Sequence, residues 1–229
     1  MKTDLPSIRQ FVATYAPEQV AAFDVAYAAA QEVVIIGSAA VGQLGPKSDL
    51  DLLMIGEGKR VKTPHLDFIW VTHKKLRSKS WLGSELATHA ARYGVWLKGS
   101  GDWKNRVFFS RLAVTHKCER ILVRLAKLYA KRHALSRTRL VSLVARCVTD
   151  MQRVVLLDKK VAVPPSDQVR QRLLEHTDEM FNQVCTEQLL GQLGRFFIEQ
   201  FIPRKDVIEF LKQERREKAP SGAVGRGRA

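Results

Sequence analysis

The most restrictive feature of the sequence is a short polar segment between two apolar runs. The first run ends at Gly37-Ser38, and the second is preceded by Asp49 and Asp51. Because side chains alternate between the faces of a strand, Asp49 and Asp51 should project from the same side if 50–55 is a strand. Two neighbouring carboxylates repel each other, and oxygen-rich pairs of this kind suit Mg²⁺. The segment therefore predicts a metal site beside a Gly-Ser turn, whose N–H groups and hydroxyl suit a phosphate.

This arrangement resembles the DNA polymerase β-like nucleotidyltransferase superfamily, in its minimal, stand-alone type. Members carry a Gly-Ser or Gly-Gly turn, then Asp-x-Asp or Asp-x-Glu, then a third acidic residue on a later strand. Here Asp49 follows Ser38 by eleven positions. The best third candidate is Asp67, in the apolar, aromatic and β-branched run 66–71.

The resemblance implies transfer of a nucleoside monophosphate from an NTP to a hydroxyl acceptor, with Mg²⁺ or Mn²⁺ as cofactor. Asp49 and Asp51 would hold two metal ions, one of them bound with the triphosphate. Asp67 would hold the second ion and help to deprotonate the attacking hydroxyl. The residues expected to bind the nucleotide are Gly37, Ser38 and Ser48.

The order of expected elements indicates an α+β fold, with a small mixed sheet flanked by helices and followed by a helical bundle. Strands are expected at about 33–37, 50–55, 66–72 and 95–97, and helices at about 7–31 and 84–93. Further helices are expected at about 105–133, 137–159, 167–190, 191–201 and 204–217. The domains should be a catalytic domain over 1–103, a helical acceptor-binding domain over 104–218 and a disordered basic tail over 219–229.

The net charge of +15 predicts a polyanionic partner, and the charge is concentrated in one part of the chain. Residues 98–146 hold thirteen Lys and Arg against two acids. Five of these basic residues are spaced 3, 4, 3 and 4 apart, which places them on one stripe of a helix: Lys117, Arg120, Arg124, Lys127 and Lys131. An apolar face should lie opposite. Because like charges in a column destabilise an isolated helix, contact with nucleic-acid phosphates is expected, with a solvated face as the alternative.

The expected acceptor is therefore a nucleic-acid end, RNA more than DNA, such as a tRNA. The same chemistry on a small molecule (an antibiotic), on a nucleotide (giving a signal) or on a protein hydroxyl (in a toxin–antitoxin pair) stays open. So does a non-catalytic nucleic-acid-binding module. In the helical half, the Arg111-x4-His116 and Arg170-x5-His176 spacings resemble the HEPN ribonuclease family and give a further alternative.

A cytoplasmic location without a membrane partner is expected. No apolar run is long enough to cross a bilayer, and the first residues match neither a signal nor a transit peptide. Cys118, Cys147 and Cys185 are far apart in sequence and are expected to be free thiols. Three aromatic residues flank the loop after the sheet, where they could stack on a base or pack internally: Tyr93, Trp96 and Trp103.

Overall fold

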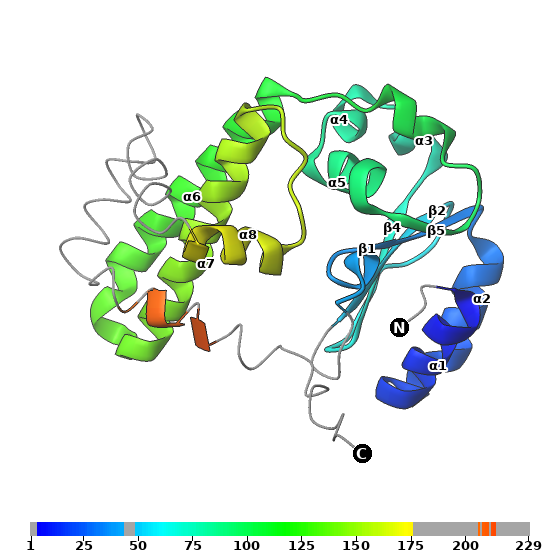
Figure 1. Ribbon diagram of the computed structural model, residues 1–229, viewed down its shortest axis with the longest axis horizontal. Helices are drawn as coiled ribbons and strands as arrows, with labels where there is room; N and C mark the ends of the chain where they lie inside the picture. Colours follow the sequence, from blue (N-terminus) through cyan, green and yellow to red (C-terminus); the bar gives the residue numbers. More distant parts are fainter. Residues whose placement is uncertain (1–3, 44–48, 176–205, 207, 211, 214–229) are drawn as a thin grey trace, which may run out of the picture.

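The computed structural model describes residues 4–43, 49–175, 206, 208–210 and 212–213, and it shows an α+β chain (Figure 1). Its strands are β1 (Glu32–Ile36), β2 (Leu50–Ile55), β3 (Val61–Lys62), β4 (Leu66–Val71) and β5 (Val95–Lys98). Its α-helices are α1 (Leu5–Tyr15), α2 (Val20–Ala29), α3 (His73–Leu76), α4 (Lys79–Leu82), α5 (Glu85–Tyr93), α6 (Arg111–Lys131), α7 (Arg137–Asp158) and α8 (Ser166–Glu175). The sheet precedes the long helices in sequence, which is the order expected from the sequence.

The strand order of the mixed sheet is β3-β4-β2-β1-β5. β2 and β4 are parallel, and their register places Asp51 opposite Asp67. β1 is antiparallel to β2 and places Ile36 opposite Asp51, so the turn at Gly37 begins beside that carboxylate. β3 is antiparallel to β4 and places Lys62 opposite Asp67. Residues from four separate stretches of sequence therefore meet where the ends of these strands lie together.

Both faces of the sheet are covered, which explains the nearly continuous apolar runs of its central strands. Helices α1 and α2 lie together on one face, where Leu52 and Phe68 belong to their core (Figure 1). Leu53 and Val71 face the other way and pack with α4, α5 and the buried Trp103. By the alternation of strand side chains, Asp51 and Asp67 project from this second face, on the side of α5.

Helices α6 and α7 pack along each other and bury a separate apolar core (Figure 1). Ser110 and Ser136 cap the starts of these helices, each accepting a hydrogen bond from the backbone N–H three residues later. The helix expected from residue 105 begins at Arg111, because residues 102–106 form a 3₁₀ helix that carries Trp103 into the sheet core. Val107 also packs against this core, so the sheet core extends past residue 103.

Several other expected boundaries differ in the structure. The helix expected over 7–31 is divided into α1 and α2 by a 3₁₀ turn at Pro17–Gln19. Two short elements add to those expected: β3, and α3 directly after β4, capped by the Thr72 hydroxyl. The helix expected over 167–190 is described only to Glu175, and those over 191–201 and 204–217 and the tail lie largely or wholly outside the described residues.

Gly94 follows the last residue of α5, but for a different reason from the usual one. Its φ is −63°, so it does not need the left-handed conformation that normally favours glycine after a helix. A Cβ there would lie 2.5 Å from the Ala90 carbonyl oxygen and 2.6 Å from Val34 Cγ1. Glycine is required because α5 approaches β1 closely.

The described helices include none that combines the length and apolar character needed to cross a membrane. Cys118 and Cys147 form no disulfide with each other in the described part of the chain. Burial is the main cause that raises the pKa of the Cys147 thiol to about 11. Cys185 lies outside the described residues.

Candidate functional site

Three carboxylates meet near the start of β2. Asp51 is partly buried, and Asp67 on the neighbouring strand is only 5% exposed. Burial, followed by repulsion from Asp49 and Asp67, raises the pKa of Asp51 to about 7. The nearby Lys62 and Arg60 lower that pKa but do not outweigh these effects. Asp51 therefore lies where negative charge is only partly compensated.

Asp67 has a different environment. The Arg60 guanidinium donates from Nε to Oδ1 at 3.0 Å and from Nη2 to Oδ2 at 2.6 Å, and Lys62 Nζ donates to Oδ2 at 3.1 Å. Burial alone would raise the pKa of Asp67, but hydrogen bonds and attraction from Arg60 and Lys62 lower it below its usual value. Both oxygens of this carboxylate are therefore engaged by cations of the same chain.

These environments decide how well each carboxylate fits a divalent cation. No group of three His, Cys, Asp or Glu side chains within the described part of the chain is arranged as a metal-ligand set. Asp49 and Asp51 still offer hard oxygen donors of the kind that Mg²⁺ prefers, and repulsion between them would be relieved by a cation. Asp49 and Asp51 therefore fit the expected ion, whereas Asp67 does not in its present contacts.

The Gly37-Ser38 turn is built against Asp51. Gly37 has a φ of +69°, and a Cβ on it would lie 2.6 Å from Asp51 Oδ2. A side chain at this position would be strained by the positive φ and would displace the Asp51 carboxylate. Ser38 begins a 3₁₀ turn over Ala39–Val41, and its carbonyl accepts hydrogen bonds from Val41 and Gln43. Ser48, the third residue expected to bind nucleotide, lies outside the described residues.

His89 on α5 is a site residue that the sequence alone did not reveal. Its Nε2 accepts a hydrogen bond from the Gly37 N–H at 3.1 Å, so Nδ1 carries the proton and donates to the Val163 carbonyl at 2.7 Å. Burial is the main cause that lowers the pKa of His89. A neutral imidazole thus joins the turn to the segment before α8. Its partners are 52 and 74 residues away in sequence, so no local pattern marks the contact.

A cavity of about 530 Å³ opens between this turn and the long helices. Gly37, Asp51 and His89 lie on one side of it. Helices α6 and α7 contribute charged residues to the other side: Lys117, Arg120, Arg124, Asp150 and Arg153. The cavity therefore gives a ligand at Asp51 access to a strongly polar wall.

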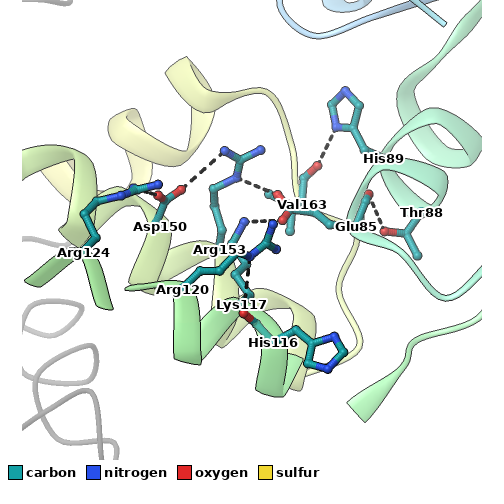
Figure 2. A network of polar contacts seen from close by, with 10 residues as sticks. All are labelled: Glu85, Thr88, His89, His116, Lys117, Arg120, Arg124, Asp150, Arg153 and Val163. Carbon is teal, nitrogen blue, oxygen red and sulfur yellow. Dashed lines mark hydrogen bonds and ion pairs between the residues drawn. The ribbon is translucent and has the colours of Figure 1, made fainter. Parts of the chain in front are cut away.

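Ion pairs connect α5 to α6 and α7 along this wall (Figure 2). Glu85 pairs through Oε2 with Lys117 and through Oε1 with Arg153 Nε at 2.8 Å. Asp150 pairs with Arg124 and lies 3.7 Å from Arg153 Nη1. Burial is the main cause that lowers the pKa of Lys117, although Glu85 counteracts it. The charges of the wall are thus largely paired with one another.

The basic stripe expected on α6 is therefore divided. Lys117 lies on the buried face of the helix, in the row that also contains Ile121, because residues four apart share a face. The expectation that the whole stripe lies opposite the apolar face was wrong for this residue. Arg124 is partly buried against Asp150. The three remaining members, Arg120, Lys127 and Lys131, are exposed.

The aromatic residues near the sheet pack within the protein. The indole N–H groups of Trp96 and Trp103 both donate to Glu32 Oε2 at 3.2 Å. The Tyr93 hydroxyl donates to the Ala162 carbonyl at 3.3 Å. Their described contacts support packing rather than base stacking.

The residues of the alternative ribonuclease spacing do not line this cavity, although the His116 carbonyl accepts a hydrogen bond from the cavity residue Arg120 at 3.3 Å. Arg111 and His116 are exposed on the first turns of α6. Arg170 pairs with Asp167 at 3.3 Å, and His176 lies outside the described residues.

Known proteins offer little direct comparison. The chain matches no protein-family model and no curated protein sequence. A solved structure with some similarity is that of a nucleotidyltransferase-like protein from Exiguobacterium sibiricum 255-15. It has 13% sequence identity and a TM-score of 0.35, and the match covers 92% of this chain and 74% of that one.

Proposed function

We propose that the chain is a Mg²⁺-dependent nucleotidyltransferase that moves a nucleoside monophosphate from an NTP to a hydroxyl group. The observation that carries the proposal is the close approach of Gly37 to Asp51, both of which line the cavity. A glycine turn allows a close approach of phosphate groups, and the Asp49 and Asp51 carboxylates would hold the ion that accompanies them.

In this reaction, the acceptor oxygen attacks the α-phosphorus as the bond to the β-phosphate oxygen breaks. Pyrophosphate leaves, and the hydroxyl proton passes to solvent. Mg²⁺ would supply positive charge for the phosphate oxygens. Asp49 and Asp51 orient the triphosphate, while His89 fixes the turn through the Gly37 N–H.

A nucleic-acid end, RNA more than DNA, is the acceptor that we propose. Arg120 lines the cavity, and Lys127 and Lys131 follow it on exposed positions of α6. Spacings of seven and four residues keep these cations near one face of the helix, where they could follow a phosphate backbone. No disulfide joins Cys118 and Cys147 in the described residues, which suits the reducing cytoplasm in which such an enzyme would meet RNA.

The test is transfer of label from each α-³²P-NTP, with Mg²⁺, to separate pools of tRNA, other RNA, DNA and the protein itself. The control is the Asp49→Asn/Asp51→Asn variant, which keeps the side-chain shapes. We expect label on RNA that the variant reduces by about a hundredfold or more, because the ion contributes several kcal/mol to the transition state. Label on DNA alone or on protein alone would show that this pool, and not RNA, is the acceptor. Label on no pool would contradict transfer to a macromolecule.

A further inference from the structure

The Asp67 carboxylate is enclosed by two cations from the adjacent hairpin. Arg60 donates to both carboxylate oxygens in a fork. Lys62, on the paired strand β3, donates to Oδ2, which thus accepts hydrogen bonds from both cations. A fork of this kind is the strongest geometry available to an arginine–carboxylate pair. Metal coordination at Asp67 would require at least one of these contacts to be given up.

The burial of the three groups is unequal. The Asp67 side chain is 7% exposed, whereas those of Arg60 and Lys62 are 58% and 66% exposed. The buried carboxylate thus meets two formal positive charges, which leaves an excess of one. A divalent cation arriving at the same oxygens would be repelled by both groups.

The two cations also keep donors for a further ligand. Asp67 takes two of the five N–H groups of the Arg60 guanidinium and one of the three of the Lys62 ammonium. Asp51 is opposite Asp67 in the parallel register, and both cations are close enough to Asp51 to act on its charge. Fixed N–H donors next to a metal-binding carboxylate are suited to phosphate oxygens that gain charge during transfer.

We propose that Arg60 and Lys62 take the place of a second metal ion, so that the site binds a single divalent cation through Asp49 and Asp51. This inference rests on the proposed function and departs from the two-ion arrangement expected from the sequence. Asp67 is then a positioning residue that holds Arg60 and Lys62 against the site. It does not coordinate the ion.

The experiment counts the Mn²⁺ ions bound by the nucleotide-free protein, from the electron paramagnetic resonance signal of free Mn²⁺ during titration. We expect one bound ion in the wild type and still one in Asp67→Asn. We expect two in Arg60→Ala/Lys62→Ala, where the carboxylate is released. Lys59→Ala removes a neighbouring exposed charge from the same loop and should leave one ion. Thermal unfolding of each variant establishes that it is folded at the temperature of the titration.

Two bound ions in the wild type would overturn the inference while leaving the proposed function intact. Loss of the ion in Asp67→Asn would also overturn it, because Asp67 would then be a ligand. A single ion in the folded double variant would show that Arg60 and Lys62 are not what excludes the second ion. No bound Mn²⁺ in the wild type would remove the metal site itself, and with it the basis of the proposed function.

Discussion

The Nε2 atom of His89 lies 3.1 Å from the amide nitrogen of Gly37, so a side chain of α5 holds the turn that contacts Asp51. The opposite ring nitrogen donates to the Val163 carbonyl, which follows the last turn of α7. Both bonds require a neutral ring with its proton on Nδ1. The turn beside the carboxylates and the helical half therefore depend on one imidazole.

His89→Gln should destabilise the protein by about 1–3 kcal/mol, because at least one buried partner loses its bond. It should also change the dependence of stability on pH. The folded pKa of His89 is below the ordinary value of 6.5, so below pH 6.5 the unfolded chain binds more protons. Wild-type stability is then full above pH 6.5 and falls as pH drops through the folded pKa.

Urea unfolding between pH 5 and pH 8 measures this difference. His89→Gln should lose the part of the slope that the wild type shows below pH 6.5. The control is His116→Gln, on an exposed position of α6, which should retain it. Equal slopes in the wild type and His89→Gln would contradict the assignment of the neutral ring.

Gly37→Ala and Gly42→Ala separate backbone strain from contact with Asp51. Both glycines have positive φ, +69° and +76°, so either alanine should cost about 1 kcal/mol of strain. Only the Cβ at position 37 meets Asp51, since nothing lies within 4 Å of one at position 42. Gly37→Ala should therefore reduce transfer by about a hundredfold through displacement of the carboxylate, and Gly42→Ala only slightly. Steady-state kinetics and chemical unfolding measure the transfer rate and the stability of both variants. Equal losses of transfer rate in the two variants would show that the contact with Asp51 is unimportant.

Asp51→Asn should stabilise the metal-free protein at pH 8. The pKa of Asp51 is raised to about 7, so its contribution to stability is full below the unfolded value of 3.8 and is lost as pH rises through about 7. Above that pH the native state holds a poorly compensated charge, whose removal should add about 1–4 kcal/mol. Mg²⁺ should raise the melting temperature of the wild type and leave that of Asp51→Asn unchanged. A variant less stable than the metal-free wild type at pH 8 would refute this account.

Glu85→Gln should destabilise the protein more than Lys117→Met. Removing the Glu85 charge leaves two buried or half-buried cations without this partner, Lys117 and Arg153, at a cost of about 3–5 kcal/mol. Lys117→Met removes the most buried cation and leaves Glu85 paired with Arg153, so about 1 kcal/mol or less is expected. Chemical denaturation measures the free energy of unfolding of the two variants. A larger loss of stability in Lys117→Met than in Glu85→Gln would contradict the role given to Glu85 as the shared partner of both cations.

The sequence revealed the parts of this architecture that depend on local pattern. Apolar, β-branched runs predicted β2 and β4, and the period of two indicated which of their side chains share a face. Helical spacing predicted α6 and α7. Whether Asp49, Asp51 and Asp67 act as expected stays a prediction, but their positions follow from short stretches of chain.

Contacts between distant residues could not be predicted in this way. Whether a cation on α6 faces solvent or a carboxylate depends on where α5 lies, so the spacing of Lys117 did not show its burial beside Glu85. The same limit applies to His89. Arg60 and Lys62 stand close to Asp67 in sequence, but only the β3–β4 pairing brings them onto its oxygens.

The ion pairs of Glu85 with Lys117 and Arg153 determine what would happen if the chain were cut into two fragments. A cut in the segment between the 3₁₀ helix over Asp102–Arg106 and α6 would leave Trp103 with the sheet. It would separate an acidic side chain on one fragment from its basic partners on the other. Neither fragment would bury these groups alone without an uncompensated charge. The two pieces should instead fold well only together, which makes this segment a natural place to split the protein into complementing halves.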